Sequence, residues 1–218
     1  MNRGKELAAG HQTERSRMFG SLSHEHQPGG EALLSTEGFA PARYFFDMLR
    51  PSLDDVPELS LPDGLEIRTA TAADARAVWL ADVESFRDNW GGFDDSDEAF
   101  QRFVSAPEFD PSLWVIAWDG DQVAGGVLDA IHPEENEELG VERGWLDSVF
   151  TRRPWRRRGL ARALIARSLV LLRERGLNAA MLGVDAHNPT GALGLYEGLG
   201  FSVVHRSTAW RRPFELFG

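Results

Sequence analysis

The sequence contains no cysteine and only one lysine. The absence of cysteine excludes several kinds of site. Without cysteine, the 218-residue chain can form no disulfide bond, no zinc–thiolate site and no thiol nucleophile. Lys5 is the only lysine, so arginine carries nearly all of the positive charge. We attribute that bias to genome composition rather than to function.

Long hydrophobic runs are missing as well. No stretch reaches the roughly 20 apolar residues that a membrane-spanning helix needs, and the N-terminus lacks the apolar core of a signal peptide. We therefore expect a cytoplasmic protein with no membrane partner. The net charge of −11 argues against nucleic acid as the main partner. The remaining composition is ordinary for a globular protein.

Residues 1–30 are rich in glycine, serine, histidine and glutamine and show no hydrophobic period. This composition predicts disorder. His11, His24 and His26 lie in this segment, but no pattern of partner ligands surrounds them. We therefore expect no metal site.

In contrast to residues 1–30, residues 31–50 show helix and strand patterns, and a linker follows them. A short helix is predicted over Glu31–Glu37, ended by a glycine, and an aromatic-rich strand over Ala42–Leu49. Residues 51–64 hold three prolines with polar spacers and read as a linker. The strand exposes more apolar surface than water tolerates, so we expect it to dock on the rest of the chain or to pair with a second chain in a homodimer.

Residues 65–218 alternate between helical and strand patterns and predict an α/β domain around a mixed sheet. The acidic stretch Glu134–Glu138 reads as a loop. Asp119-Gly120 marks a hairpin, and Thr71 with Asp74 marks a helix start. The expected strands are Leu65–Arg68, Leu113–Trp118, Gln122–Ile131, Trp145–Thr151, Ala179–Val184 and Phe201–Trp210. The expected helices run from Thr71 to about Asp88 and over Ser96–Val104, Arg162–Arg175 and Thr190–Leu199.

The stretch Thr151–Ala161 is the candidate binding site for an anion. It reads Thr-Arg-Arg-Pro-Trp-Arg-Arg-Arg-Gly-Leu-Ala and joins a buried strand to a helix. The first turn of a helix presents free backbone N–H groups and the positive end of the helix dipole, which together suit a phosphate. The arginines add charge that can pair with phosphate oxygens. A basic spot on an acidic chain points to a small anionic ligand.

Arg156–Ala161 resembles the Arg/Gln-x-x-Gly-x-Gly/Ala loop with which the GNAT (GCN5-related) N-acetyltransferases bind the pyrophosphate of acetyl-coenzyme A. Asp185–Phe201 resembles the second signature of that family, where an asparagine precedes a helix that carries a tyrosine and ends at Gly-Phe. The resemblance implies a GNAT fold and acetyl-CoA as the acyl donor, with no metal. The residues that it implies in cofactor binding are Val149, Thr151, Arg156, Arg157, Arg158, Gly159, Leu160, Ala161 and Asn188.

The resemblance implies that Tyr196 is the general acid, because it occupies the family's usual position for that residue. A phenol with a pKa near 10 can protonate a leaving thiolate. The acceptor amine must also lose a proton. Asp147, on the strand before the arginine turn, is our candidate base, and Asp129, Glu134 or a water molecule are alternatives.

The N-terminal segment repeats the C-terminal one at a shift of 162 positions. Gly38-Phe39 falls on Gly200-Phe201, and Arg50-Pro51 falls on Arg212-Pro213. The segment resembles the tail of a preceding GNAT copy, as in tandem, mycothiol-synthase-like GNAT proteins. Leu34 stands where the second copy has its tyrosine, and no Arg-x-x-Gly-x-Ala loop precedes it. This remnant alone therefore cannot hold acetyl-CoA.

We therefore expect an acetyl-CoA-dependent N-acetyltransferase that acts on a small amine by direct attack. A GNAT-fold module that binds an acyl-CoA or regulates without turnover is the alternative. The acceptor is open: a mycothiol precursor, an aminoglycoside, an amino acid and a protein N-terminus all fit. The aromatic and acidic residues before the second helix suit a cationic amine, but equally a packed helix junction; these are Phe86, Trp90, Phe93, Asp94 and Asp95.

Overall fold

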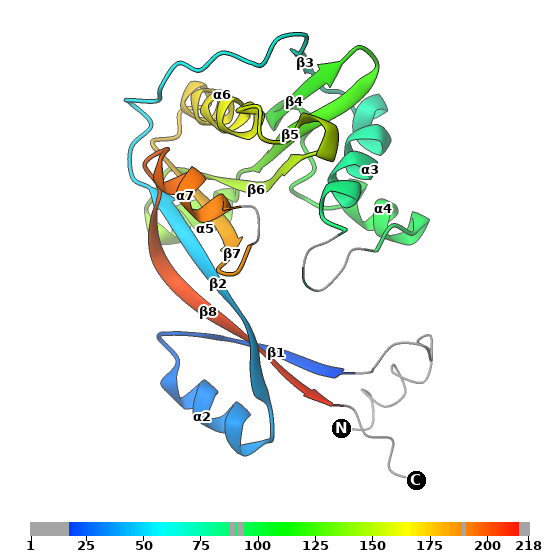
Figure 1. Ribbon diagram of the computed structural model, residues 1–218. Helices are drawn as coiled ribbons and strands as arrows, with labels where there is room; N and C mark the ends of the chain where they lie inside the picture. Colours follow the sequence, from blue (N-terminus) through cyan, green and yellow to red (C-terminus); the bar gives the residue numbers. More distant parts are fainter. Residues whose placement is uncertain (1–17, 88–89, 91–93, 189–190, 214–218) are drawn as a thin grey trace. The chain divides into compact units, whose positions relative to one another are not determined.

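The computed structural model describes residues 18–87, 90, 94–188 and 191–213 (Figure 1). Its elements up to the middle of the chain are β1 (Met18–His24), α2 (Pro28–Thr36), β2 (Ala40–Arg50), β3 (Glu66–Thr69), η1 (Ala72–Asp74), α3 (Ala75–Ser85), α4 (Asp97–Val104), η2 (Pro111–Leu113) and β4 (Trp114–Asp119). The later elements are β5 (Gln122–Ala130), α5 (Pro133–Leu139), β6 (Arg143–Thr151), η3 (Arg153–Trp155), α6 (Leu160–Glu174), β7 (Ala179–Asp185), α7 (Ala192–Glu197) and β8 (Ser202–Pro213).

The eight strands form one mixed sheet in the order β1-β8-β2-β7-β6-β5-β4-β3. Strands β6 and β7 run parallel, whereas β3 to β6 pair antiparallel in sequence order and β1 pairs antiparallel with β8. The predicted mixed α/β fold with flanking helices is confirmed. None of the helices in the described part of the chain combines the length and the hydrophobicity needed to span a bilayer.

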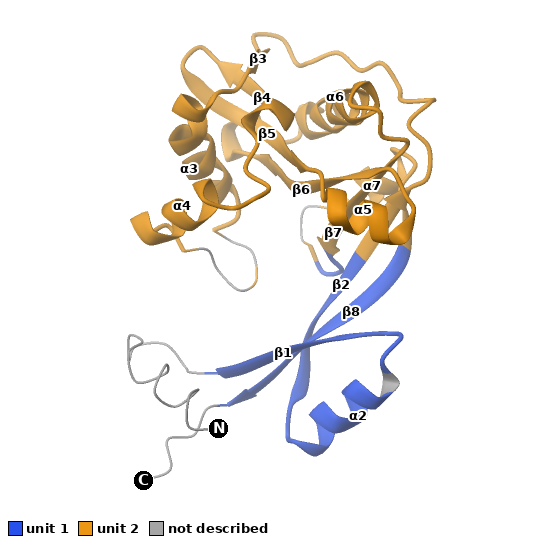
Figure 2. Ribbon diagram, turned by 180° about the vertical axis from the view of Figure 1, so that it is seen from behind, with its two compact units in different colours: residues 1–46, 185–187, 204–218 blue, residues 47–184, 188–203 orange. Residues whose placement is uncertain are grey.

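The chain divides into two compact units (Figure 2). Unit 2 comprises residues 47–184 and 188–203, and unit 1 comprises residues 1–46, 185–187 and 204–218. The long strands β2 and β8 contribute residues to both units.

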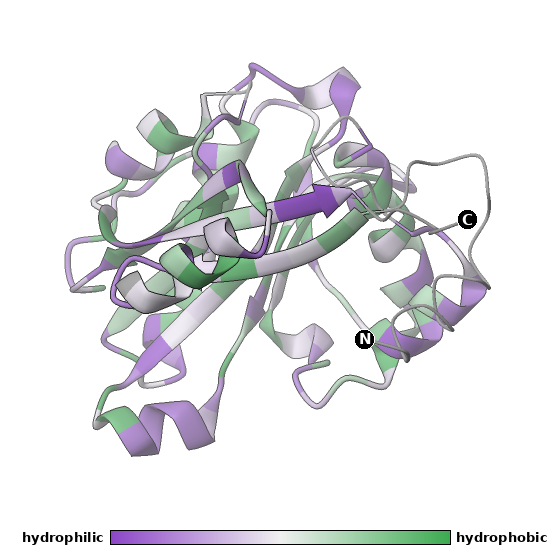
Figure 3. Cartoon of the chain, turned by 90° about the horizontal axis from the view of Figure 1, so that it is seen from below, coloured by the Kyte–Doolittle hydropathy of each residue, from purple (hydrophilic) through white to green (hydrophobic). Residues whose placement is uncertain are grey.

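Unit 2 holds most of the buried apolar side chains. On one face of its sheet, α3 packs its small residues against a large aromatic layer that includes Trp114, Trp118 and Phe150. On the other face α6 buries Leu164, Ile165, Leu169 and Leu172 completely. Figure 3 shows green, hydrophobic stretches along the strands between these layers. This two-layer burial is what fixes the strand ends that carry the candidate site.

The linker between β2 and β3 has no helix or strand, but it is anchored. Leu53 is fully buried, its N–H donates to the Asn178 carbonyl at 3.0 Å, and its carbonyl accepts from Arg173 at 3.2 Å. The segment therefore belongs to the packed surface of unit 2 rather than acting as a free tether.

Unit 1 contains a strand that the sequence analysis assigned to disorder. Residues 18–24 form β1, which pairs along its whole length with β8 from Met18↔Pro213 to His24↔Ser207. Disorder was therefore the wrong prediction for residues 18–30, and residues 1–17 lie outside the described part. The partner strand lies about 190 residues away in the sequence, so local composition could not reveal the pairing.

A second correction concerns the acidic stretch predicted as a loop, which is the helix α5. Pro133 lies in its first turn, where a missing N–H costs nothing. Glu134 and Glu135 also lie there, and their negative charges interact favourably with the positive end of the helix dipole. Gly140, with φ 63°, ends the helix in the left-handed conformation. These capping signals outweigh the lack of an apolar face.

The element order of the N-terminal segment matches that of the C-terminal segment at the predicted shift. At a shift of 162 positions β1, α2 and β2 fall on β7, α7 and β8. Gly38 (φ 77°) and Gly200 (φ 84°) both end their helices in the left-handed conformation. Arg212 donates to the carbonyl of Glu37 in unit 1, and Arg50 donates to the carbonyl of Leu199 in unit 2. These two contacts are equivalent under the shift, because each links the strand of one segment to the helix end of the other.

Candidate active site

The arginine turn between β6 and α6 is built on buried anchors. Trp155 is 5% exposed, and its indole N–H donates to Asp119 at the end of β4 at 2.9 Å. Arg152 forms an ion pair of 2.9 Å with Glu84 of α3. A short 3₁₀ turn over Arg153–Trp155 thus holds the chain close to the sheet before the helix begins.

Arg156 is committed to the protein itself. Its guanidinium donates to the Thr151 carbonyl at 2.9 Å and to the Ser85 carbonyl at the end of α3 at 3.0 Å. The side chain therefore ties the turn to the end of α3. Arg157 and Arg158 are exposed, and the structure shows no hydrogen bond or ion pair for either among the described residues. These two remain available to an anion.

The backbone of the turn is shaped to expose N–H groups. Arg157 has φ 60°, which a residue with a side chain rarely adopts, and Gly159 has φ 83°. A Cβ added at Gly159 would meet nothing within 4 Å. The helix begins where the Ala163 N–H bonds the Gly159 carbonyl at 3.1 Å, so the preceding amides have no partner within the helix. This is the geometry of an anion site at the start of a 15-residue helix.

Strands β6 and β7 part next to this turn. Their parallel pairing covers only Arg143–Trp145 and Ala179–Met181. The Arg152 N–H points to Ala124 of β5, and N–H groups alternate in direction along a strand. The amides of Val149 and Thr151 therefore point away from β5, toward the side where β7 has separated. The Thr151 hydroxyl is also buried without a hydrogen-bond partner in the described part of the chain.

Asp147 lies at an irregularity in the sheet. Leu128 of β5 pairs with Ser148, but the next residue, Asp129, pairs with Leu146, so Asp147 is an extra residue in β6. Surrounding protein raises the pKa of Asp147 above its ordinary value by removing hydration, and the charge of Glu108 adds to this, while His132 lowers it. Asp147 nevertheless remains exposed to solvent.

Glu108 and His132 complete a small polar group with Asp147. The His132 Nδ1 lies 3.9 Å from the Glu108 carboxylate, and its ring meets Trp145 edge-on at 6.3 Å between centroids. Neither residue stood out in the sequence, because they come from separate loops. Two carboxylates and an imidazole next to the separated strands can bind a cationic amine and accept its proton.

The alternative bases differ in accessibility. Asp129 is 2% exposed and accepts a hydrogen bond of 2.7 Å from Ser168 of α6, and its burial raises its pKa well above the usual range. A group so enclosed cannot meet an amine directly. Glu134 is exposed on the first turn of α5.

A second buried carboxylate was not predicted from the sequence. Asp82 of α3 accepts a hydrogen bond of 2.5 Å from the Ser148 hydroxyl of β6. Burial raises the pKa of Asp82 to about 6, and the Ser148 hydrogen bond opposes the rise. A pKa close to neutrality suits a base. Only the packing of α3 on β6 makes this pair, so no local sequence signal could have identified it.

Tyr196 and Asn188 come from the segment after β7. Tyr196 is 7% exposed near the end of α7, with its ring 6.1 Å from that of Phe201 in an edge-on contact. Burial raises the pKa of Tyr196 to about 12. Asn188 is half-buried, and its carbonyl lies 3.5 Å from the Gly191 N–H.

The residues expected near an acceptor are partly engaged elsewhere. Asp94 pairs with Arg102 at 3.0 Å, and Asp95 lies 3.7 Å from Arg87. Phe86 packs against the core below α3. Phe93 lies outside the described residues. The acidic pair thus resembles a solvated helix junction more than an amine site.

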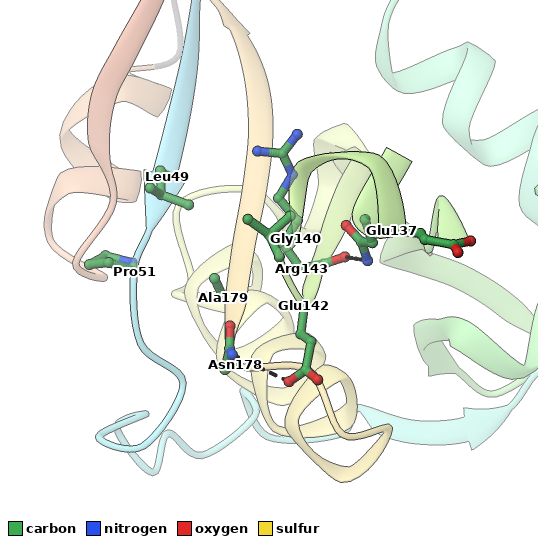
Figure 4. A pocket seen from close by; sticks show the side chains of 10 residues that line it. Leu49, Pro51, Glu137, Gly140, Glu142, Arg143, Asn178 and Ala179 are labelled. Carbon is green, nitrogen blue, oxygen red and sulfur yellow. Dashed lines mark hydrogen bonds between the residues drawn. The ribbon is translucent and has the colours of Figure 1, made fainter. Parts of the chain in front are cut away.

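A hollow of about 590 Å³ lies at the other end of β6 and β7 (Figure 4). It is lined by the residues where the two strands begin, among them Arg143 and Ala179, and by α5. The arginine turn follows the opposite ends of these parallel strands. The hollow is therefore separate from the candidate site.

Comparison with known proteins agrees with this geometry. Residues 76–201 match the model of the Acetyltransferase (GNAT) family. The mycothiol acetyltransferase of Geodermatophilus obscurus is 31% identical over 194 residues, which cover 87% of this chain and 62% of that protein. The mycothiol acetyltransferase of Thermobispora bispora is 32% identical over 192 residues, covering 87% and 64%.

Among solved structures, the GCN5-related N-acetyltransferase from Sphaerobacter thermophilus superimposes with a TM-score of 0.77 at 27% identity. The match covers 96% of this chain and 64% of that one. The chain thus spans less than two thirds of the length of each of these relatives. The family match covers more than half of the chain and includes the arginine turn, the bulged strand and Tyr196, and the chain therefore belongs to the acetyltransferase (GNAT) family.

Proposed function

We propose that the chain transfers an acetyl group from acetyl-CoA to the amine of a small molecule. The observation that carries this proposal is the arginine turn at the start of α6. There, free backbone amides and an open Gly159 lie next to two arginines that have no partner among the described residues. Such a site suits the pyrophosphate of coenzyme A. The buried Thr151 hydroxyl supports it, because it has no hydrogen-bond partner in the described part of the chain and a bound ligand would supply one.

The donor would lie along the open side of β6. The amides of Val149 and Thr151 are candidates to hold the pantetheine arm and the thioester as an added strand would. Gly159, Leu160 and Ala161 would face the pyrophosphate with their backbone, together with the side chains of Arg157 and Arg158. Arg156 would act by holding the turn in shape, and Asn188 would contact the arm from the β7 side.

In the proposed reaction the neutral amine attacks the thioester carbonyl, the C–S bond breaks, and the thiolate leaves. Tyr196 would give its proton to the sulfur. Its raised pKa keeps the phenol protonated at neutral pH. The thiolate leaves in surroundings that also lack water, which raises its own proton affinity and favours the transfer.

The amine proton would pass to Asp147, directly or through water. A carboxylate whose pKa is raised by the loss of hydration is a stronger base. Glu108 would help to hold the cationic form of the amine beforehand. Asp82 is the competing base, since its pKa of about 6 also fits.

The proposed class of acceptor rests on the names of the relatives. Two of them are named mycothiol acetyltransferase, so an amine precursor of mycothiol is the first acceptor to test. The repeat of β1-α2-β2 in β7-α7-β8 supports a further proposal, that residues 18–50 are the end of a preceding GNAT copy. Leu34 in place of a tyrosine argues that this copy has no catalytic role.

The test is release of free thiol from acetyl-CoA in the presence of single amines. The panel contains a mycothiol precursor, an aminoglycoside, an amino acid amide and a peptide with a free N-terminus. Thiol release that depends on one amine, with an acetylated product of the expected mass, supports the proposal. If acetyl-CoA binds by calorimetry but no amine raises thiol release above background, the non-catalytic binding module is the correct function.

A further inference from the structure

Glu25, His26 and His205 form a cluster in unit 1, whereas the residues of the candidate active site belong to unit 2. The His26 Nε2 lies 3.2 Å from the His205 Nδ1, and 3.9 Å from the nearer Glu25 carboxylate oxygen. One ligand atom from each of the three lies within 4.8 Å of the other two. All three side chains are exposed, so an ion could reach them from solvent.

The strand register brings these residues together. In the β1–β8 ladder His24 is opposite Ser207, and the Glu25 N–H continues the ladder to the Arg206 carbonyl at 3.0 Å. His26 therefore comes to lie opposite His205, 179 residues away in the sequence. The Arg206 N–H also donates to Glu25 at 3.1 Å, which holds the carboxylate beside the two rings.

The spacing matches that of metal ligands. Two imidazole nitrogens at about 2.05 Å from a tetrahedral zinc ion are about 3.3 Å apart. The two histidine nitrogens are 3.2 Å apart without an ion. The carboxylate has to close from 3.9 Å to a similar separation, which is within the reach of an exposed glutamate side chain. Imidazole and carboxylate are donors that zinc and its neighbours in the transition series accept.

The repeat gives the cluster a context. At the shift of 162 positions Glu25 and His26 fall on His187 and Asn188, and Asn188 is a candidate acetyl-CoA residue. The first copy thus carries two possible metal ligands at the position where the second copy has a residue of the proposed active site. A copy without its tyrosine and its arginine turn can use this position for another purpose.

We propose that Glu25, His26 and His205 bind one divalent transition-metal ion, with zinc as the best fit, and that water completes the coordination. The ion would link the turn between β1 and α2 to β8 and so fasten the N-terminal segment to the last strand. Because it would bind the folded chain and not the unfolded one, it would raise the stability of the fold. The competing explanation is a hydrogen bond between two imidazoles with no ion.

The experiment titrates zinc into the full chain without an affinity tag, by calorimetry near pH 7.5, and records the melting temperature with and without zinc. All proteins carry His11→Gln, because His11 lies outside the described residues and could bind zinc independently. We expect one zinc ion per chain and a higher melting temperature with zinc. His26→Ala and His205→Ala should each weaken zinc binding at least about 10-fold and abolish the shift in melting temperature.

His24→Ala is the matched control, since His24 is exposed two residues away and is not in the cluster. It should bind zinc as its parent does. Glu25→Gln provides a second test in case the histidine variants misfold. Its amide oxygen can still accept a hydrogen bond from the Arg206 N–H, so the local structure should be kept. It too should weaken zinc binding. Zinc binding that is equal in the parent, Glu25→Gln and His205→Ala, or that is lost in His24→Ala, would overturn the proposal.

Discussion

The two connections that follow the parallel strands β6 and β7 make an instructive comparison. Each leads from a strand into a helix through a glycine in the left-handed conformation, Gly159 with φ 83° and Gly191 with φ 75°. The helix after β6 has 15 residues and begins next to Arg157 and Arg158, which have no partner in the part of the chain that the structure describes. The helix after β7 has six residues and buries Tyr196.

The difference suits one connection to binding the donor and the other to catalysis. A long helix with free first-turn amides and unpaired cations can hold a multiply charged phosphate group. A helix of under two turns adds little charge at its start, but it can place one side chain in a poorly hydrated position. We infer that the β6–α6 connection provides most of the affinity for acetyl-CoA, while the β7–α7 connection provides the proton. Changes in the two connections should therefore have different kinetic consequences.

Gly159→Glu should have the largest effect. The carboxylate would stand where the pyrophosphate is proposed to bind, and a residue with a side chain is also strained at φ 83°. We expect the affinity for acetyl-CoA to fall by at least about 100-fold, since one buried like-charge contact costs several kcal/mol. Isothermal titration calorimetry measures this directly.

Gly176→Glu is the control for this variant. Gly176 follows the far end of the same helix, has φ 86°, and also has open space around it. It therefore suffers the same backbone strain and gains the same charge without approaching the turn. Similar losses of affinity in the two variants would mean that strain, not the pyrophosphate, explains the effect at Gly159.

Tyr196→Phe should have the next largest effect, and on a different quantity. Losing the proton donor should lower kcat by about 100-fold or more, while the dissociation constant of acetyl-CoA stays within about 2-fold of wild type. Because the pKa of Tyr196 is raised to about 12, the wild-type donor should remain protonated from pH 6 to 9, and no loss of rate in that range should come from it. An unchanged kcat would assign the acid role to water or another group.

Asp147→Asn tests the base and should have a smaller effect, because water can replace a solvent-exposed carboxylate. A base must be ionised, so the wild-type kcat/KM should rise with pH through the pKa of Asp147, which is raised above its ordinary value. We expect a fall of about 10-fold above that pKa and a weaker dependence on acid pH in the variant. A pH–rate profile with acetyl-CoA saturating measures both.

Asp82→Asn is the comparison for this experiment. Asp82 would give an acid limb near pH 6 if it were the base. If that limb persists in Asp147→Asn and disappears in Asp82→Asn, with the melting temperature of both variants near wild type, then the base is Asp82 and the assignment of Asp147 is wrong.

The features predictable from the sequence are those whose cause is local. The Thr71–Asp74 capping box and the Asp119–Gly120 hairpin appear as expected, because neighbouring residues alone determine them. The boundaries of the strands and helices predicted after residue 65 agree to within about three residues, and α5 is the helix that was missed. The arginine turn itself could be placed because a strand pattern, a glycine and a helix pattern follow one another without interruption.

The features that were missed depend on distant partners. Strand β1 exists because β8 is beside it. Asp82 meets Ser148 only when α3 packs on β6. The three arginines Arg156, Arg157 and Arg158 look alike in the sequence, yet only the first is held by two backbone carbonyls. A one-dimensional pattern shows which residues could bind a phosphate, but not which of them the fold already uses.

That distinction among the arginines gives the smallest of the predicted effects. Arg157→Ala and Arg158→Ala should each weaken acetyl-CoA binding about 3- to 10-fold, the range expected for one charge-assisted contact at an exposed position. The loss should shrink at high salt, because both side chains are exposed and salt screens them.

Arg156→Ala should instead lower the melting temperature, since it removes the hydrogen bonds to Thr151 and Ser85. Arg167→Ala, an exposed arginine further along α6, is the control and should change neither quantity. Calorimetry at low and high salt, with a melting curve for each variant, separates these outcomes. If Arg157→Ala and Arg158→Ala both bind acetyl-CoA like wild type at low salt, the backbone amides alone hold the phosphate and the two arginines have no role in binding.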